Sequence, residues 1–181
     1  MSTAFGPSAL ATPANLLTLG RVVVVPILVV AILRGGEGWG VLTLWVVLAV
    51  SDLADGWLAR RQGTTRSGAY LDPLADKVLV LGGMAAMVRV GLLWWVPVAV
   101  IALRELVVSA YRSSLGRRGV SVPARPGGKL KTFVQATAVG MALAPLGGPA
   151  YDAVAGTVLW IAVGLTVVTG AQLLVGAAPR R

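Results

Sequence analysis

The hydrophobic positions of this chain fall into six long apolar segments, separated by short stretches rich in Gly, Pro and charged residues. Each segment is close to the ~20 residues that an α-helix needs to cross the hydrocarbon core of a bilayer. The pattern predicts an all-α integral membrane protein. The expected bundle has six transmembrane helices, over residues of about 15–33, 41–60, 68–88, 92–113, 129–146 and 154–175.

No segment of the sequence reads as a soluble domain or an internal repeat. We therefore expect one membrane domain over residues 1–181, with a mobile N-terminal tail at 1–13 and a short basic C-terminal tail at 176–181. The N-terminus lacks the basic region of a signal peptide, so the first apolar segment is expected to be retained as a helix. Pro26 lies inside that helix and is a candidate kink.

The composition limits the chemical groups that could carry out a reaction. Of the 181 residues, 56% are hydrophobic and 13% are charged, and the chain holds neither Cys nor His. Disulfides, thiol nucleophiles, Cys/His zinc sites and imidazole bases are excluded, so carboxylates, hydroxyls and cations must carry any reaction. The net charge of +9 suits anionic lipids and phosphorylated substrates. Nucleic acid is not an expected partner, because the basic residues lie in short loops between helices.

The basic residues also predict the orientation. Two of the sixteen, Arg34 and Arg89, lie on one expected side of the membrane, and three, Arg21, Lys77 and Arg104, lie within helices. By the positive-inside rule the rest face the cytoplasm, together with both termini. Trp39, Trp94 and Trp95 then fall at the outer interface. The expected location is a cytoplasmic (inner) membrane of bacterial type. The cytoplasmic set is Arg60, Arg61, Arg66, Arg112, Arg117, Arg118, Arg125, Lys129, Lys131, Arg180 and Arg181.

Four of the seven acidic residues lie between positions 52 and 76, next to strongly apolar flanks: Asp52, Asp55, Asp72 and Asp76. Carboxylates entering apolar helices cost several kcal/mol (roughly 2–4) unless cations compensate them. On a helix with ~100° per residue, one face holds positions 52, 55, 56, 59 and 60, within an arc of about 140°. Positions 68, 72 and 76 are four apart and drift by about 80°. Two antiparallel helices would bring all four carboxylates to a similar depth near the cytoplasmic side.

Converging carboxylates repel one another, and one or two divalent cations would relieve that repulsion. Oxygen ligands suit Mg²⁺, Mn²⁺ or Ca²⁺ rather than zinc. Two such ions ~4 Å apart form a common clamp for phosphoryl chemistry. Gly56 and Ala59 leave room for a ligand on the acidic face, and Arg60 can pair with a phosphate. The competing interpretation is that the Asp residues form ion pairs at helix ends with Arg60, Arg61, Arg66 and Lys77.

The string Asp52-x-x-Asp55-Gly56-x-x-Ala59-Arg60, followed by Gly68-x-x-x-Asp72-x-x-x-Asp76, resembles the signature of the CDP-alcohol phosphotransferases. These membrane enzymes make phospholipids from a CDP-linked donor. One departure is a short loop between Arg60 and Gly68. The resemblance implies six helices, a homodimer, and two cations, Mg²⁺ or Mn²⁺, held by the four Asp residues. It also implies that Asp76 is the base that activates the acceptor hydroxyl. The donor would be surrounded by Asp55, Gly56, Ala59, Arg60 and Gly68.

Further segments resemble the branch of this family that joins CDP-diacylglycerol to glycerol 3-phosphate. They are NLLTLGR at 15–21, DPLADK at 72–77, LRELVVSAYR at 103–112 and GGKLKTFVQ at 128–136. The first of them places Asn15, Thr18 and Arg21 on one helix face, where they can approach the nucleotide. Helix capping and anchoring to lipid headgroups are the competing roles for these three.

A second group of residues suits an anionic acceptor. Arg104 and Arg112 are eight residues apart, about 80° round a helix, and Lys129 begins the fifth helix at the expected depth of the acidic site. With Lys131 they are the candidate binders of the acceptor phosphate. Two alternatives stay open. Glu105 or one of the Asp residues could neutralise Arg104, and Lys131 could contact lipid headgroups.

Two rival functions remain. The same chemistry could use another acceptor, such as inositol phosphate or another alcohol. A divalent-cation transporter could use the carboxylates as a transit site, but it would place acidic residues through the whole membrane depth. In this sequence the acidic residues cluster at one side, and the predicted outer half carries almost none.

Overall fold

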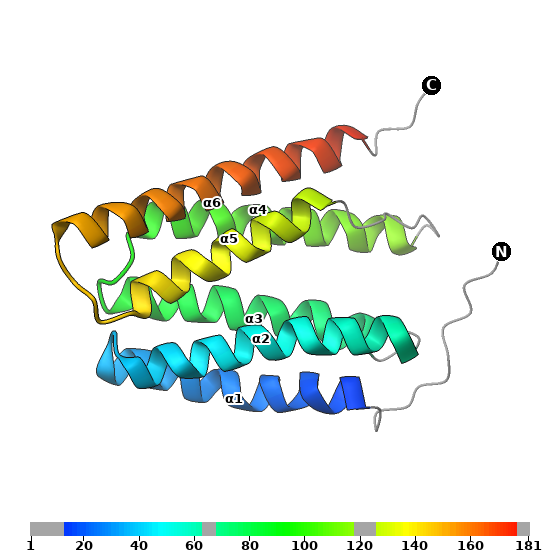
Figure 1. Ribbon diagram of the computed structural model, residues 1–181. Coiled ribbons are helices and arrows are strands. Elements are labelled where there is room, and N and C mark those ends of the chain that lie inside the picture. The colour runs from blue at the N-terminus through cyan, green and yellow to red at the C-terminus, as the bar shows by residue number, and fades with distance from the viewer. Residues whose placement is uncertain (1–12, 63–67, 118–125, 177–181) are drawn as a thin grey trace. The chain divides into compact units, whose positions relative to one another are not determined.

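The computed structural model describes the backbone of residues 13–62, 68–117 and 126–176, and the side chains of residues 20–51, 77–115 and 127–175. The described chain forms six helices and contains no strand. They are α1 (Pro13–Gly35), α2 (Trp39–Gln62), α3 (Gly68–Arg89), α4 (Trp95–Arg117), α5 (Pro126–Leu143) and α6 (Pro149–Gly176) (Figure 1). The all-α prediction is therefore confirmed.

Helix boundaries follow local chemistry. Helices α5 and α6 each begin at a proline, earlier than the apolar pattern predicts, because proline suits the first helical position, where its missing N–H is not needed. Helix α1 continues through Pro26. At the connection before α6, Gly147 and Gly148 have φ angles of 41° and 116°, a backbone region that favours glycine. Helix α5 ends at Leu143, two residues before Pro145, because a proline disfavours the helical conformation of the residue that precedes it.

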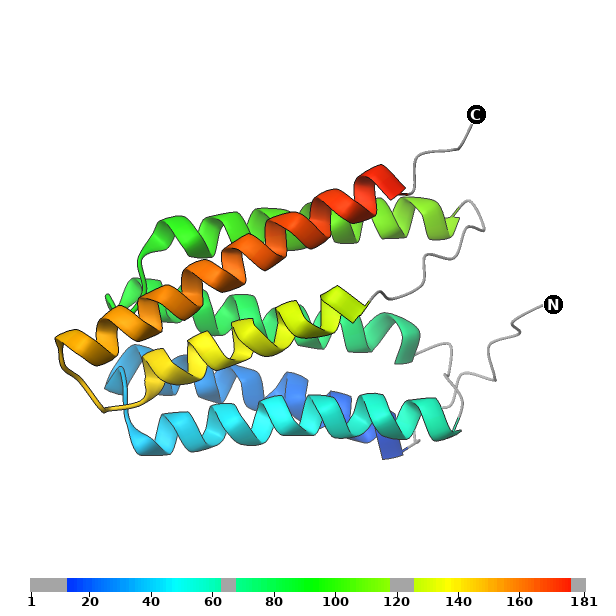
Figure 2. The ribbon, with the colours of Figure 1, turned by 45° about the horizontal axis from the view of Figure 1, so that its top comes forward.

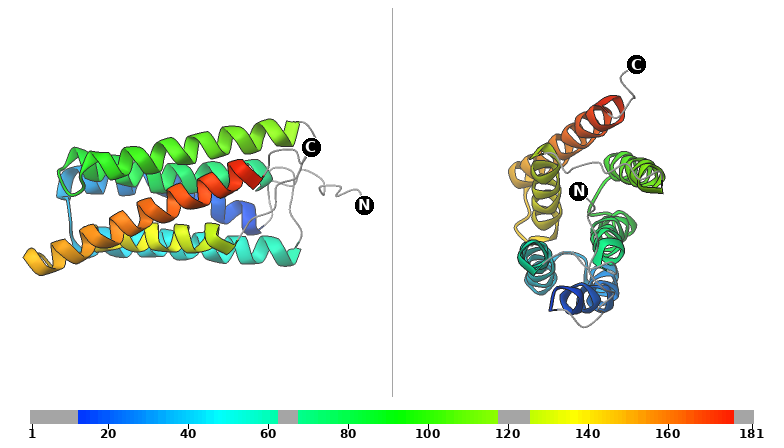
Figure 3. Two further views of the ribbon diagram at one scale, coloured as in Figure 1. Left: turned by 90° about the horizontal axis from the view of Figure 1, so that it is seen from above. Right: turned by 90° about the vertical axis from the view of Figure 1, so that its right-hand side faces the viewer.

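The chain divides into two compact units, Met1–Leu92 with α1 to α3 and Leu93–Arg181 with α4 to α6. In the first unit α1 packs against both α2 and α3, and the end-on view in Figure 3 shows α1 beside each of them. The buried face of α1 carries Val25, Leu28 and Ile32, all nearly inaccessible to solvent. Their spacing of three and four residues is that of one helix face.

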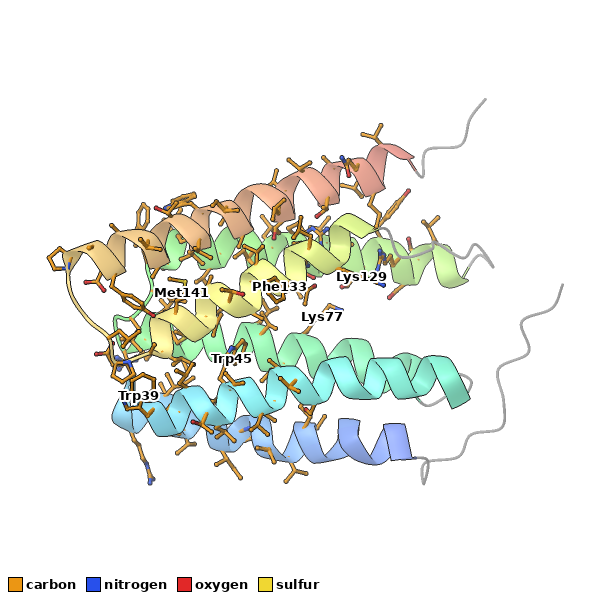
Figure 4. The ribbon with its side chains drawn as sticks, viewed as in Figure 1. Trp39, Trp45, Lys77, Lys129, Phe133 and Met141 are labelled. Atoms are coloured by element: carbon orange, nitrogen blue, oxygen red, sulfur yellow. The ribbon has the colours of Figure 1, made fainter. Side chains whose placement is uncertain are left out.

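Two contacts fix the register of the helices in the first unit. A Cβ on Gly82 of α3 would lie 3.7 Å from Cγ2 of Val29 on α1, and a Cβ on Gly83 would lie 3.6 Å from Cζ3 of Trp45 on α2. Trp45 is buried, and its side chain extends from α2 (Figure 4). Both distances are ordinary van der Waals contacts, so Gly82 lies beside Val29 of α1 and Gly83 lies beside the indole ring of Trp45 on α2.

In the second unit α6 packs against both α5 and α4, and Figure 2 shows α6 running beside them. The core of this unit is apolar and comes from all three helices. Its buried members include Ile101 and Val108 of α4, Val139 and Leu143 of α5, and Leu159, Ala162 and Val163 of α6.

Helix α6 is also the most apolar. Within the described part of the chain, Pro149–Val175 is the helix that is long and apolar enough to cross a membrane, with a mean hydropathy of 2.1, and Trp39–Ser51 is a shorter apolar stretch. That all six helices span a membrane stays a prediction, as does the grouping of residues 1–181 into a single domain.

Candidate functional site

The acidic positions lie on two helices of the first unit. The backbone of α2 is helical through positions 52, 55 and 60, and that of α3 is helical from position 68 past position 76. The helix faces on which the sequence argument depends are therefore present. The side chains of the four Asp residues lie outside the described ones. The side chains of Asn15, Thr18, Ala59 and Arg60 also lie outside the described ones. Residues 63–67, the middle of the short loop, lie outside the described backbone.

The contact between Trp45 and Gly83 aligns the two acidic helices. Asp52 follows Trp45 by seven residues, and Asp76 precedes Gly83 by seven. Seven residues are about 10.5 Å along a helix and nearly two full turns. Asp52 therefore lies within about 20° of the helix face that carries Trp45, and Asp76 lies within about 20° of the face that carries Gly83. Because α2 and α3 run in opposite directions (Figure 1), positions 52 and 76 are at about the same level on facing sides. Whether their carboxylates converge stays a prediction.

The donor atoms of these helices fit a hard divalent cation. All the candidate ligands are carboxylates, which suit Mg²⁺ and Mn²⁺, and the facing register of positions 52 and 76 places ligands on both helices. Among the described side chains no group of three or more Asp, Glu, His or Cys residues lies together. The metal site on the acidic segments of α2 and α3 stays a prediction.

A polar cluster in the second unit surrounds Arg104 of α4. The Arg104 Nε donates a hydrogen bond of 2.9 Å to the backbone carbonyl of Thr166, and Nη2 donates one of 3.0 Å to Oγ1 of Thr169. The Nη1 forms an ion pair of 2.9 Å with Oε1 of Glu105. The Arg104 side chain is only 14% exposed. These contacts hold the guanidinium against α6 in a fixed orientation.

Lys131 of α5 joins the same cluster. Its Nζ forms an ion pair with Oε1 of Glu105, and its side chain is 8% exposed. One turn further along α5, Nε2 of Gln135 donates a hydrogen bond of 3.0 Å to Oγ1 of the buried Thr166. The cluster thus brings two cations, Arg104 and Lys131, to one carboxylate oxygen.

The structure separates the four candidate phosphate binders. Arg104 and Lys131 meet on Glu105, whereas Arg112 and Lys129 are exposed, and Figure 4 shows Lys129 near the start of α5. The alternative in which Glu105 pairs with Arg104 is observed. The burial of Lys131 does not suit a contact with lipid headgroups. The binding of an acceptor phosphate by these four residues stays a prediction.

Sequence reasoning missed most of the residues that hold the cluster together. Thr166, Thr169 and Gly170 lie at spacings of three and four on one face of α6, and Gln135 follows Lys131 by four on α5. Those spacings were available in the sequence. Without the helix packing, however, they did not indicate which faces meet.

Gly170 gives Arg104 access to α6. In a helix the Cβ atom points toward the N-terminus, so a side chain at position 170 would overlie the carbonyl of Thr166. A Cβ there would lie 2.9 Å from Nε and 3.1 Å from Cγ of Arg104. The hydrogen bonds described above would have to break for Arg104 to move away.

Gly170→Ala is therefore expected to be about 1–3 kcal/mol less stable than Gly164→Ala, because a well-packed site resists an added methyl group. Gly164 is the matched control, since it lies on the same helix and has no atom within 4 Å of the added Cβ. Both changes gain the same helix propensity. Thermal unfolding of the purified proteins measures the difference, and equal stability of the two variants would show that Arg104 is not confined.

Comparison with known proteins bears on both units. The sequence model of the CDP-alcohol phosphatidyltransferase family matches residues 11–168. The chain belongs to this family. The match includes both acidic helices and the charged members of the polar cluster, so the resemblance predicted from the Asp signature is confirmed. The family is one of membrane-associated enzymes.

Curated relatives of this family member carry similar names. A "Probable phosphatidylglycerophosphate synthase" of Mycobacterium tuberculosis is 43% identical over 172 residues, which are 91% of this chain and 81% of that protein. The "CDP-diacylglycerol--glycerol-3-phosphate 3-phosphatidyltransferase" of Rickettsia felis is 32% identical over 163 residues, 86% of this chain and 90% of that protein. The enzyme of the same name from Escherichia coli K12 is 41% identical over 133 residues, 69% of this chain and 72% of that protein.

Proposed function

We propose that this protein is a phosphatidylglycerophosphate synthase, which transfers the phosphatidyl group of CDP-diacylglycerol to glycerol 3-phosphate and releases CMP. The observation that carries the proposal is the similarity, along most of the chain, to relatives named for this reaction. The polar cluster supports it, because an acceptor that carries a phosphate needs cationic groups and the cluster contains two, Arg104 and Lys131.

The donor side of the reaction belongs to α1, α2 and α3. Asp52, Asp55, Asp72 and Asp76 are the ligands for two divalent cations, Mg²⁺ or Mn²⁺, which would neutralise the diphosphate of the donor. The facing register of α2 and α3 supports this assignment. The remaining donor-binding residues of the proposal are Asn15, Thr18, Asp55, Gly56, Ala59, Arg60 and Gly68.

The acceptor side belongs to α4 and α5. Arg104, Arg112, Lys129 and Lys131 bind the phosphate of glycerol 3-phosphate. Asp76 accepts the proton of the acceptor hydroxyl, whose oxygen attacks the phosphorus that carries the diacylglycerol. The bond from that phosphorus to the bridging oxygen breaks, and CMP leaves with the bridging oxygen on its own phosphate. The proton stays on Asp76 until the next exchange with solvent.

The proposed setting is a bacterial-type inner membrane, crossed by all six helices, with both termini in the cytoplasm and two copies in a homodimer. Large apolar side chains exposed on several helices support an environment of lipid, among them Val23, Leu103 and Phe133 (the last labelled in Figure 4). Trp39, Trp94 and Trp95 are also exposed. The ring of Trp94 stacks edge-on against that of Trp160 at 6.2 Å. Tryptophan at the ends of membrane helices is typical of the lipid–water interface.

The decisive experiment measures CMP release by purified protein in detergent, with CDP-diacylglycerol and Mn²⁺ or Mg²⁺. Glycerol 3-phosphate is expected to support turnover at least about a hundredfold faster than inositol phosphate, since a site built for one acceptor leaves polar groups unpaired with another. Chelation of the metal with EDTA is expected to stop the reaction.

Three outcomes would contradict the proposal. Faster CMP release with inositol phosphate would assign the protein to another acceptor within the family. Release of CMP without any acceptor would indicate a hydrolase. No CMP with either acceptor, in protein that unfolds cooperatively on heating, would remove the transferase assignment.

A further inference from the structure

Among the described side chains of the first unit, Arg21 is a buried cation. It lies on α1 with only 2% of its surface exposed. It shares a helix face with Val25, Leu28 and Ile32, because positions 21, 25, 28 and 32 fall within an arc of about 60°. A guanidinium in an otherwise apolar stripe is costly unless an opposite charge or polar groups accompany it. The side chain does have an interaction partner.

The direction of this face identifies its neighbours. Helix α1 packs against both α2 and α3, and the end-on view of Figure 3 shows α1 beside each of them. Its buried face is therefore expected to look toward these two helices. These two helices carry all four acidic residues of the hairpin. The remaining acidic residue of the unit, Glu37, is exposed in the connection at the other end of α1.

The level of Arg21 also matches that of the acidic positions. The contact of Val29 with Gly82 aligns α1 with α3, and the two helices run in the same direction (Figure 1). Position 21 precedes Val29 on α1 by eight residues, and position 74 precedes Gly82 on α3 by eight. Both positions are therefore about 12 Å along their helices from the contact, and at the same level. Position 74 is midway between Asp72 and Asp76. The contact of Trp45 with Gly83 brings Asp52 to the same level.

We propose that Arg21 is the resident counter-cation of the acidic hairpin, a positioning residue that balances part of the carboxylate charge before any metal ion binds. Four carboxylates on two facing helices repel one another strongly in a low-dielectric setting. One fixed cation beside them reduces the charge that the metal-free protein must tolerate. The same cation opposes the entry of metal ions, so it keeps their binding reversible.

This inference rests on the proposed function in taking the four Asp residues as the metal site, but its test does not depend on turnover. The alternative role for Arg21 is a contact with the donor diphosphate. The two roles differ in the absence of substrate: a counter-cation acts on metal-free protein, whereas a substrate contact does not.

The experiment compares thermal unfolding of wild type and Arg21→Met in EDTA and in saturating Mn²⁺, without substrate. In EDTA the midpoint of Arg21→Met is expected to fall by at least about 5 °C, because removal of one partner leaves buried charge uncompensated. In Mn²⁺ the fall is expected to be less than half as large. Titration should show Mn²⁺ binding about tenfold more tightly to the variant, as loss of a nearby positive charge strengthens cation binding.

Two further variants test whether charge is the cause. Arg21→Lys keeps the charge and is expected to keep most of the stability in EDTA. Arg34→Met removes an exposed cation from the same helix and should shift the midpoint by less than about 2 °C in either condition.

A double variant tests the partner. In EDTA, Arg21→Met combined with Asp76→Asn should be more stable than Arg21→Met alone, because one negative charge fewer remains to be balanced. If Arg21→Met alone does not fold, the double variant is still expected to fold. A double variant as unstable as the single one would overturn the proposal.

Three other results would also overturn it. Equal destabilisation in EDTA and in Mn²⁺ would show that Arg21 only packs. Unchanged stability together with a raised KM for CDP-diacylglycerol would show that it binds the donor. A wild type that Mn²⁺ does not stabilise would remove the metal site itself. Failure of the proposed function is separate, since it appears as the absence of CMP release from wild type.

Discussion

Asp76→Asn is expected to lower the rate of CMP release by about a hundredfold to ten-thousandfold, the range that loss of a general base produces. The amide that replaces the carboxylate is similar in size but cannot accept the acceptor's proton and is a poorer ligand for Mg²⁺ or Mn²⁺. The rate is measured with saturating CDP-diacylglycerol and glycerol 3-phosphate. Thermal unfolding in EDTA should show a folded protein, since the change removes a charge from a crowded set of carboxylates.

The matched control is Asp152→Asn, which makes the same substitution at an exposed position in the first turn of α6. Its rate is expected to stay within about twofold of wild type, as for most surface substitutions. A wild-type rate for Asp76→Asn would end the assignment of Asp76 as the base. Equal losses in both variants would indicate a general effect on the protein instead.

Glu105→Gln is expected to lower the stability of the protein by about 3 kcal/mol. Glu105 is 15% exposed and pairs with both Arg104 and Lys131. Removal of one member of a buried ion pair leaves the others without compensation, which typically costs about 3–5 kcal/mol. The low end applies because Arg104 keeps its hydrogen bonds to Thr166 and Thr169. Thermal or denaturant unfolding in detergent gives the measurement.

A second substitution separates charge from shape. Lys131→Met in the Glu105→Gln background removes the cation that has lost its ion pair with Glu105, so it is expected to recover at least about 1 kcal/mol. Glu37→Gln is the control, because Glu37 is an exposed carboxylate in a connection. Its effect should be within about 0.5 kcal/mol. If Glu105→Gln is no less stable than Glu37→Gln, the ion pairs do not stabilise the second unit.

The helices could be predicted from the apolar pattern because each apolar segment is long and ends in residues that stop helices. The main differences are at Pro126 and Pro149, where the helices begin before the apolar residues do. The pattern of hydrophobic residues does not indicate a helix that begins before its apolar residues. Proline at the first helical position does, because its fixed φ suits a helix and its missing N–H is not needed there.

The facing register of α2 and α3 could also be predicted, because it depends on helix geometry and a short connection. Counting residues from Asp52 and Asp76 placed them at one depth, and the contact of Trp45 with Gly83 puts the two backbones in that register. The directions of the side chains at these positions stay a prediction.

Packing between distant helices could not be predicted. Lys129 and Lys131 differ by about 200° round a helix, so the sequence already indicated that they do not share a face. It did not indicate which face of α5 meets Glu105, because that depends on how α5 and α4 pack against α6. For the same reason the polar face with Arg21 could be recognised in the sequence, whereas its burial could not.

The ring of Trp45 bears on the movement of an ion within the first unit. It lies buried between α2 and α3, about two turns beyond the level of Asp52 and Asp76, where Met84 and Met87 are buried as well. An ion that moved beyond the acidic level would meet side chains that carry no oxygen ligand for a hard cation.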